Sequence, residues 1–202
     1  MTVAAPRLLH LNGPPGIGKS TLARMYVDRH PGVLDLDIDQ LRTMIGGSHD
    51  RFAETGEIVR VLALSMASAH LQTGRDVVLP QYLGRLSEID RFERVAGESG
   101  ATFREVVLMD TRERSIERFD RRGEHEGLPW HQAVRAAVAS NGGPALLADM
   151  YDRLAEVIRS RPGAMVVASV EGAIVETFEA LASALDGIDQ APVDGSGTSP
   201  SR

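Results

Sequence analysis

The sequence contains no cysteine, a single lysine and no long run of apolar residues. The lack of cysteine excludes disulfide bonds, thiolate metal sites and a cysteine nucleophile. No apolar run approaches the length of a membrane span, and the first residues, MTVAAPRLLHLNG, lack the pattern of a secretion signal. We therefore expect a cytoplasmic protein that does not enter a membrane.

Charge gives a further exclusion. The 22 Lys+Arg and 28 Asp+Glu residues leave a net charge of −6, which disfavours a protein whose main task is to neutralise a nucleic-acid backbone or an anionic membrane. With 202 residues, 43% of them hydrophobic, the chain is long enough to bury a sizeable core. Among the basic residues, Lys19 stands out because every other one is an arginine.

Short apolar runs alternate with longer amphipathic stretches along the chain. The apolar runs predict strands, listed by position as 7–12, 33–37, 76–79, 103–109 and 165–168. The amphipathic stretches predict helices at 20–30, 51–72, 86–97, 111–122 and 174–185, with two more after Pro129. Pro144 suits the first turn of the second of these two. In the 51–72 helix the apolar residues at helical spacing are Ile58, Leu62, Met66 and Ala69.

This alternation predicts an α/β protein of three layers, in which helices cover both faces of a mainly parallel, five-stranded sheet. From Asp186 onward the composition shifts to Gly, Ser, Pro and Asp, with almost nothing to bury. We therefore expect one domain over 1–186 and a disordered tail over 187–202. The six histidines lack metal-binding spacing, and His10, inside the first strand, is expected in the core.

One motif carries clear chemistry, and it lies between the first predicted strand and helix. Residues Gly13, Pro14, Pro15, Gly16, Ile17, Gly18, Lys19, Ser20 and Thr21 match G-x-x-x-x-G-K-[ST], the phosphate-binding P-loop. Its glycines let backbone N–H groups point at an anion, and the following helix adds its positive end. Lys19 is expected on the β- and γ-phosphates, and the Ser20 hydroxyl on Mg²⁺.

The second strand leads into an acid-rich segment, LDLDIDQLR at 34–42. Unpaired carboxylates are too costly to bury within a covered sheet, so Asp37 and Asp39 are expected at the sheet edge that carries the P-loop. Asp39 has two interpretations: it caps a short helix, or it is a carboxylate near the γ-phosphate that acts as a base for an acceptor hydroxyl or as an outer ligand of Mg²⁺. Arg42, three residues later, can share its helix face and suits an anionic or polar acceptor.

The P-loop, the Asp-x-Asp-x-x-Arg segment and a later arginine-rich helix together resemble the small P-loop kinases grouped with chloramphenicol phosphotransferase and the zeta toxins. The resemblance implies that Asp39 is the catalytic base. It also implies that Arg118 and Arg122 grip phosphates from a helical lid, at about 112–135. The sequence itself places Arg114, Arg118 and Arg122 on one helix stripe, although interleaved acids also fit a solvated, salt-bridged helix.

The third strand ends differently from many P-loop enzymes, which place an aspartate there to hold Mg²⁺ through water. Here Pro80 and Gln81 follow the strand, and a neutral glutamine supplies no charge. Asp37 or Asp39 must then compensate, and we predict Ser20 and Asp37 as the magnesium residues. Gln81, Tyr82 and Arg85 are expected to face the acceptor together with Asp39 and Arg42.

These patterns predict an ATP-dependent kinase with Mg²⁺ that phosphorylates a hydroxyl of a small molecule, such as an antibiotic, a sugar or a nucleoside. Two alternatives stay open. One is a polynucleotide or nucleotide-sugar kinase, of which the acidic charge disfavours the polynucleotide form. The other is an NTP-hydrolysing switch without an acceptor. The acceptor, the choice between ATP and GTP, and the oligomeric state leave no readable pattern in the sequence.

Overall fold

The computed structural model describes residues 5–48, 51–125 and 129–189, without the side chains of 122–125, 129–130 and 186–189. Within these residues one parallel sheet of five strands has the order β2-β3-β1-β4-β5. The strands are β1 (Arg7–Asn12), β2 (Leu34–Asp35), β3 (Val77–Leu79), β4 (Thr102–Met109) and β5 (Met165–Ala168). The predicted five-stranded parallel sheet is confirmed.

The described ranges contain eight helices: α1 (Lys19–Arg29), α2 (Ile38–Thr43), α3 (Phe52–Leu71), α4 (Leu86–Glu98), α5 (Arg112–His125), α6 (Pro129–Ser140), α7 (Pro144–Ser160) and α8 (Ile174–Asp189). Most bounds fall within one or two residues of prediction, but β2 is shorter and α5 longer. Pro144 occupies the first turn of α7, as predicted. Helix α8 extends into the segment predicted as a tail, and the remainder of that segment, 190–202, lies outside the described residues.

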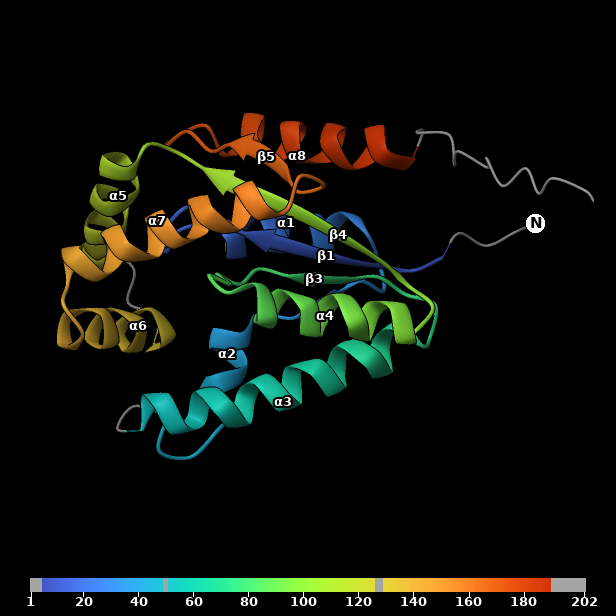
Figure 1. Ribbon diagram of the computed structural model, residues 1–202, viewed down its shortest axis with the longest axis horizontal. Helices are drawn as coiled ribbons and strands as arrows, with labels where there is room; N and C mark the ends of the chain where they lie inside the picture. The colour runs from blue at the N-terminus through green and yellow to red at the C-terminus, as the bar shows by residue number, and fades with distance from the viewer. Residues whose placement is uncertain (1–4, 49–50, 126–128, 190–202) are drawn as a thin grey trace, which may run out of the picture.

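Helices cover both faces of the sheet (Figure 1). On one face, Leu9 and Leu11 of β1 pack with residues of α1 and α8. On the other face, Leu8 packs with residues of α3 and α4. This alternation of β1 side chains is the two-residue period of a strand buried on both sides. The three-layer prediction is therefore confirmed, and no described helix is long and apolar enough to cross a membrane.

Helix α3 buries a different face from the one that its large apolar residues suggest. Ile58, Leu62 and Met66 are 51%, 43% and 38% exposed. The buried face is formed mainly by small residues, listed as Thr55, Gly56, Val59, Ala63, Ala67 and Leu71. Small side chains let α3 approach α2 and α4 closely, so packing distance outweighs the size of the individual side chains here. The apolar residues at helical spacing in the sequence, Ile58, Leu62, Met66 and Ala69, therefore do not mark the buried face of α3.

Helices α5 and α6, with the start of α7, form a separate small unit at the carboxyl end of the sheet (Figure 1). Phe119, Val138 and Leu147, one from each helix, make its buried centre. This unit corresponds to the predicted lid at about 112–135, extended by the rest of α6.

A core polar network, formed by His10, Asn12, Glu105 and Arg161, crosses the sheet interior. Glu105 accepts hydrogen bonds from Arg161 Nε and from Asn12 Nδ2, the latter at 3.3 Å, and His10 Nδ1 lies 3.4 Å from its Oε1. Burial alone would raise the pKa of Glu105, but the hydrogen bonds from His10, Arg161 and Asn12 outweigh it and lower that pKa. A buried carboxylate with such partners stays ionised.

The core polar network also fixes two loops at the carboxyl edge of the sheet. Asn12 Oδ1 accepts from the backbone N–H of Gly13 at 2.9 Å and of Leu83 at 3.1 Å. His10 Nε2 lies 3.0 Å from the carbonyl oxygen of Gln81. His10 is fully buried, as predicted. The network therefore joins the beginning of the P-loop to the segment that follows β3.

Candidate active site

The P-loop runs from the end of β1 to the beginning of α1, and two of its glycines have positive φ for steric reasons. At Gly13 (φ +148°) a Cβ would lie 2.7 Å from the carbonyl oxygen of Leu108. At Gly16 (φ +81°) it would lie 2.9 Å from Cα of Phe119 in α5. Any side chain at either position would force the backbone apart. The loop is therefore wrapped tightly against β4 and α5.

Lys19 and Ser20 open helix α1 directly after the loop. The Lys19 ammonium donates hydrogen bonds to the carbonyl oxygens of Gly13 and Pro14, both at 2.9 Å. These contacts hold the charge across the mouth of the loop, beside the backbone N–H groups at the helix N-terminus. Thr21, the last motif residue, is exposed on α1.

Asp37, and not Asp39, caps helix α2. Its Oδ1 accepts from the backbone N–H groups of Asp39 at 3.0 Å and Gln40 at 3.3 Å, which is the standard N-cap arrangement. The cap interpretation of Asp39 was therefore wrong by two residues, because the helix begins at Ile38, before Asp39. The Asp39 carboxylate therefore has no capping role in α2.

Asp39 is half-buried, lines open space on one side and lies near charges of both signs. Burial raises the pKa of its carboxyl, and the neighbouring Asp37 carboxylate raises it further, while Arg42 and Lys19 act in the opposite direction. A raised pKa makes a carboxylate a stronger proton acceptor. The environment therefore suits a base more than an inert surface acid.

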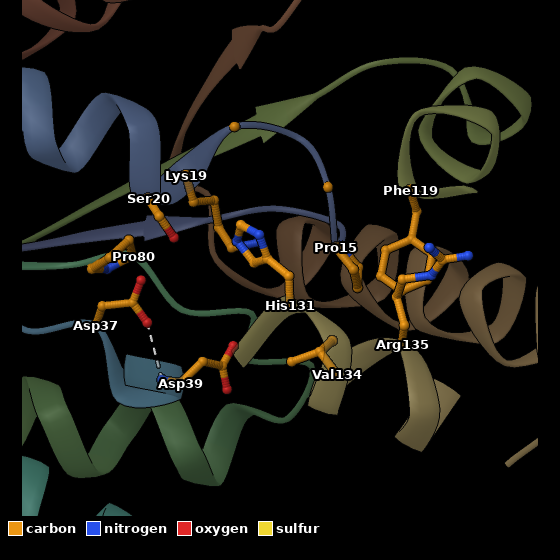
Figure 2. A pocket seen from close by; sticks show the side chains of 12 residues that line it. Pro15, Lys19, Ser20, Asp37, Asp39, Pro80, Phe119, His131, Val134 and Arg135 are labelled. Atoms are coloured by element: carbon orange, nitrogen blue, oxygen red, sulfur yellow. Dashed lines mark hydrogen bonds between the residues drawn. The ribbon is translucent and has the colours of Figure 1, made fainter. Parts of the chain in front are cut away.

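Two cavities meet at the P-loop. The first holds the phosphate-binding side of the site (Figure 2), where Ser20 lies near Asp37 and Lys19 extends toward His131 and Asp39. Its lining includes residues that sequence reasoning did not single out, namely Phe119 of α5 and, from α6, His131, Val134 and Arg135. Their spacing in α6 is i, i+3 and i+4, a helix-face signal that was present in the sequence.

The second cavity, of about 430 Å³, lies beside the first. It brings together the residues predicted to face an acceptor, listed as Asp39, Arg42, Gln81, Tyr82 and Arg85. Pro15, Lys19 and Asp39 line both cavities, so the P-loop and a carboxylate stand at their junction. Arg60, Glu88 and Arg153 also line the second cavity, and they were missed because α3, α4 and α7 carry no local motif there.

Tyr82 is fixed in the second cavity by α7. Its hydroxyl donates to the carbonyl oxygen of Met150 at 3.0 Å, and burial raises its pKa to about 12. The phenol therefore stays protonated at neutral pH, and its ring forms part of the cavity wall while its hydroxyl makes a hydrogen bond.

Arg118 is tied to the P-loop backbone. Its guanidinium donates to the carbonyl oxygens of Ile17 at 2.9 Å and Ser169 at 2.7 Å, and it lies 3.4 Å from Asp110. Ser169 supports the same point, because its Oγ also donates to Ile17 at 2.9 Å. Arg118 thus stabilises the P-loop through the backbone carbonyl oxygen of Ile17. Arg122 lies on the same helix, in the part whose side chains are outside the described structure.

Ser20 and Asp37 fit a magnesium ion as a pair. The two side chains line the phosphate cavity together, and a hydroxyl with a carboxylate is an oxygen donor set that Mg²⁺ accepts alongside phosphate oxygens and water. Because Asp37 also caps α2, its carboxylate is held in place. No group of three or more His, Asp or Glu residues among the described side chains forms a protein-only metal site.

The tight glycine loop, the lysine at its end and the parallel sheet behind it define a P-loop nucleotide-binding protein of the kinase-like type. The chain belongs to the AAA-domain family, whose model matches residues 8–141. A search of curated protein sequences finds no significant match. The finer resemblance to chloramphenicol phosphotransferase and the zeta toxins stays an expectation.

Solved structures with the same fold include a gluconokinase, a tunicamycin resistance protein and a chain of an RNA repair complex. A gluconokinase from Sinorhizobium meliloti 1021 is 18% identical, with a TM-score of 0.58, over 92% of this chain and 96% of its own. The Deinococcus radiodurans tunicamycin resistance protein is 15% identical, with a TM-score of 0.56, over 90% and 96%. A chain of the Pnkp1/Rnl/Hen1 RNA repair complex is 21% identical, with a TM-score of 0.61, over 79% and 47%. At these identities the likeness concerns the fold alone.

Proposed function

We propose that the protein is an ATP-dependent phosphotransferase that moves the γ-phosphate to a hydroxyl group of a small molecule. The observation that carries the proposal is the position of Asp39. Its carboxylate lines both the phosphate cavity and the 430 Å³ cavity beside it, opposite Lys19. A base at the boundary between a nucleotide and a second pocket is what phosphoryl transfer to a bound acceptor requires.

In this mechanism the P-loop N–H groups and Lys19 hold the β- and γ-phosphates. An acceptor hydroxyl in the second cavity attacks the γ-phosphorus; its proton passes to Asp39, and the bond to the β–γ bridging oxygen breaks with ADP as the leaving group. Arg135, which lines the phosphate cavity and makes no ion pair with any described residue, supplies further positive charge. Mg²⁺ held by Ser20 and Asp37 would neutralise phosphate charge.

The second cavity weighs against an NTP-hydrolysing switch, which needs only water beside the γ-phosphate. The choice among small-molecule, nucleotide-sugar and polynucleotide acceptors rests on experiment. The test is transfer of labelled γ-phosphate from ATP to a panel of antibiotics, sugars, nucleosides, nucleotide sugars and short oligonucleotides.

We expect at least one hydroxyl acceptor to become labelled, and Lys19→Ala to abolish the labelling without unfolding the protein. Stimulation of ADP release by that acceptor would be the second sign of a kinase. ATP hydrolysis that no acceptor changes would favour the switch. Wild-type turnover by Lys19→Ala would place the nucleotide elsewhere and contradict the proposal.

A further inference from the structure

The side chain of Arg42 is buried, yet it makes neither a hydrogen bond nor an ion pair with any described residue. It is only 9% exposed, and its Nε and Nη1 atoms are buried without a partner. Burying an unpartnered donor costs free energy, and more so when the donor is charged. Burial in fact lowers the pKa of Arg42, and the nearby Arg60 adds to this effect against the pull of Asp39. The fold therefore carries an unfavourable charge here.

The surroundings of Arg42 leave its hydrogen-bonding edge available. Its guanidinium carbon stands 3.8 Å from the centre of the Phe52 ring, so one face of the plane is covered by an aromatic side chain. A Cβ at Gly56 would lie 3.5 Å from Nη2, an ordinary van der Waals distance, so α3 passes close beside the group without crowding it. Stacking restrains the plane, while the N–H donors lie within it and remain unused.

The cavity around Arg42 has a positive excess. Four arginines line it, namely Arg42, Arg60, Arg85 and Arg153, against Asp39 and Glu88. Arg60 is paired with Glu88 at 3.3 Å, and Arg153 with Asp149. Arg85 forms no ion pair with any residue that the structure describes, so two positive charges in this cavity lack a partner.

We infer that the acceptor is an anion: besides the hydroxyl that receives the phosphate, it carries a carboxylate or phosphate group that binds Arg42. The inference rests on the proposed function, since it names the acceptor class of the same site. An oxyanion supplies the acceptors that the in-plane N–H groups of Arg42 lack, and guanidinium matches such groups two bonds at a time. Arg85 also lines this cavity but is exposed, so its charge attracts an anion without the cost of burying an arginine.

Anion binding can be measured without turnover. With the P-loop filled by a non-hydrolysable ATP analogue and Mg²⁺, inorganic sulfate and acetate are titrated into the full chain by calorimetry, one tetrahedral and one planar oxyanion. We expect wild type to bind at least one of them, Arg42→Met to bind it roughly 10- to 100-fold more weakly, and Arg94→Met to match wild type. Arg94 is the control because it is exposed on α4 and makes no ion pair with described residues.

The two anions distinguish a phosphate-bearing from a carboxylate-bearing acceptor. Equal binding by wild type and Arg42→Met, or no binding by wild type, would overturn the inference. Neither result bears on phosphate transfer itself. The kinase proposal fails separately, if the analogue does not bind or Lys19→Ala leaves transfer unchanged.

Stability gives an independent readout. Because Arg42→Met replaces an unpartnered buried charge with an apolar side chain, we expect its melting temperature to equal or exceed that of wild type. In the labelling assay, glucose, gluconate and glucose 6-phosphate present matched neutral and anionic acceptors, and any preference for an anionic member should disappear in Arg42→Met. A lower melting temperature with unchanged anion binding would show that Arg42 serves the fold instead.

Discussion

At the residue scale, Asp39 lies at the junction of the two cavities, and it does not cap helix α2 because Asp37 does so. Asp39→Asn removes the proton acceptor but nearly preserves shape. We expect phosphate transfer to fall roughly 10²-fold or more, with ATP affinity little changed. Melting temperature should hold or rise slightly, because a half-buried charge with a raised pKa is lost. A rate that recovers as magnesium is increased would indicate a metal-binding role instead, and a fully active variant would contradict the base assignment.

Asp35, at the end of β2, provides a pH-dependent test outside the site. Burial, followed by the charge of Asp37, raises its pKa from 3.8 to about 6, although Arg24 opposes the shift. The folded state therefore binds the proton more tightly than the unfolded state. The stability that this group contributes is present below about pH 4 and is lost as pH rises through about 6.

For Asp35→Asn we expect unfolding free energy at pH 8 to rise by roughly 1–2 kcal/mol, discounted for solvent and for Arg24. Near pH 3.5 the difference from wild type should vanish. Urea unfolding at both pH values measures this, with the exposed Asp120→Asn as control. A gain that is the same at both pH values would show that charge is not its cause.

At the scale of elements, α5 and α6 each contribute one arginine to the P-loop region, with different contacts. Arg118 of α5 holds the loop backbone, whereas Arg135 of α6 lines the phosphate cavity. Arg118→Met should destabilise the protein by roughly 2–3 kcal/mol, since it removes the nearer of the two arginines paired with Asp110 and the donor to the carbonyl oxygens of Ile17 and Ser169. Arg135→Met should leave stability within about 0.5 kcal/mol but lower kcat roughly 10²-fold.

Thermal unfolding and single-turnover transfer separate these two roles, with exposed Arg94→Met in α4 as the matched control. If Arg118→Met is stable and slow while Arg135→Met is fully active, the two helices have been assigned the wrong way round, and the sequence-based expectation for Arg118 is right.

The elements also show how far the sequence alone reaches. The P-loop is contiguous, so its motif could be read directly, and parallel topology then brought Asp39, Arg42, Gln81, Tyr82 and Arg85 to one edge. By contrast, the positions of His131 and Arg135 depend on how α6 packs on α5, which no local pattern states. The same limit explains α3, where close packing through alanine and glycine decided the buried face against the larger apolar residues.

At the scale of the molecule, the core polar network joins the P-loop to the acceptor cavity through the sheet. Glu105→Gln should lower the unfolding free energy by roughly 3 kcal/mol at pH 7. It should also raise KM for the acceptor more than for ATP, because Asn12 and His10, which hold Leu83 and Gln81, lose the carboxylate that they both contact. Since the pKa of Glu105 is lowered, the stability it contributes is present above the unfolded value of 4.5 and is lost as pH falls.

The loss in Glu105→Gln should therefore shrink in acid, which urea unfolding at pH 3 and pH 7 would measure. As a matched control, Glu98→Gln alters an exposed α4 carboxylate without a described partner. A destabilised variant with unchanged KM values would mean that the network supports the fold without positioning the acceptor segment.

The placement of the sole lysine has a consequence for chemical labelling. Lys19 holds the only side-chain amine in the chain, and that amine sits at the mouth of the P-loop. An amine-selective acylating reagent can therefore modify one side chain, apart from the terminal α-amino group. A bound phosphate chain would occupy that amine and slow its acylation. Mass spectrometry of the single modified peptide would then report nucleotide occupancy in the unmutated protein, with no engineered probe.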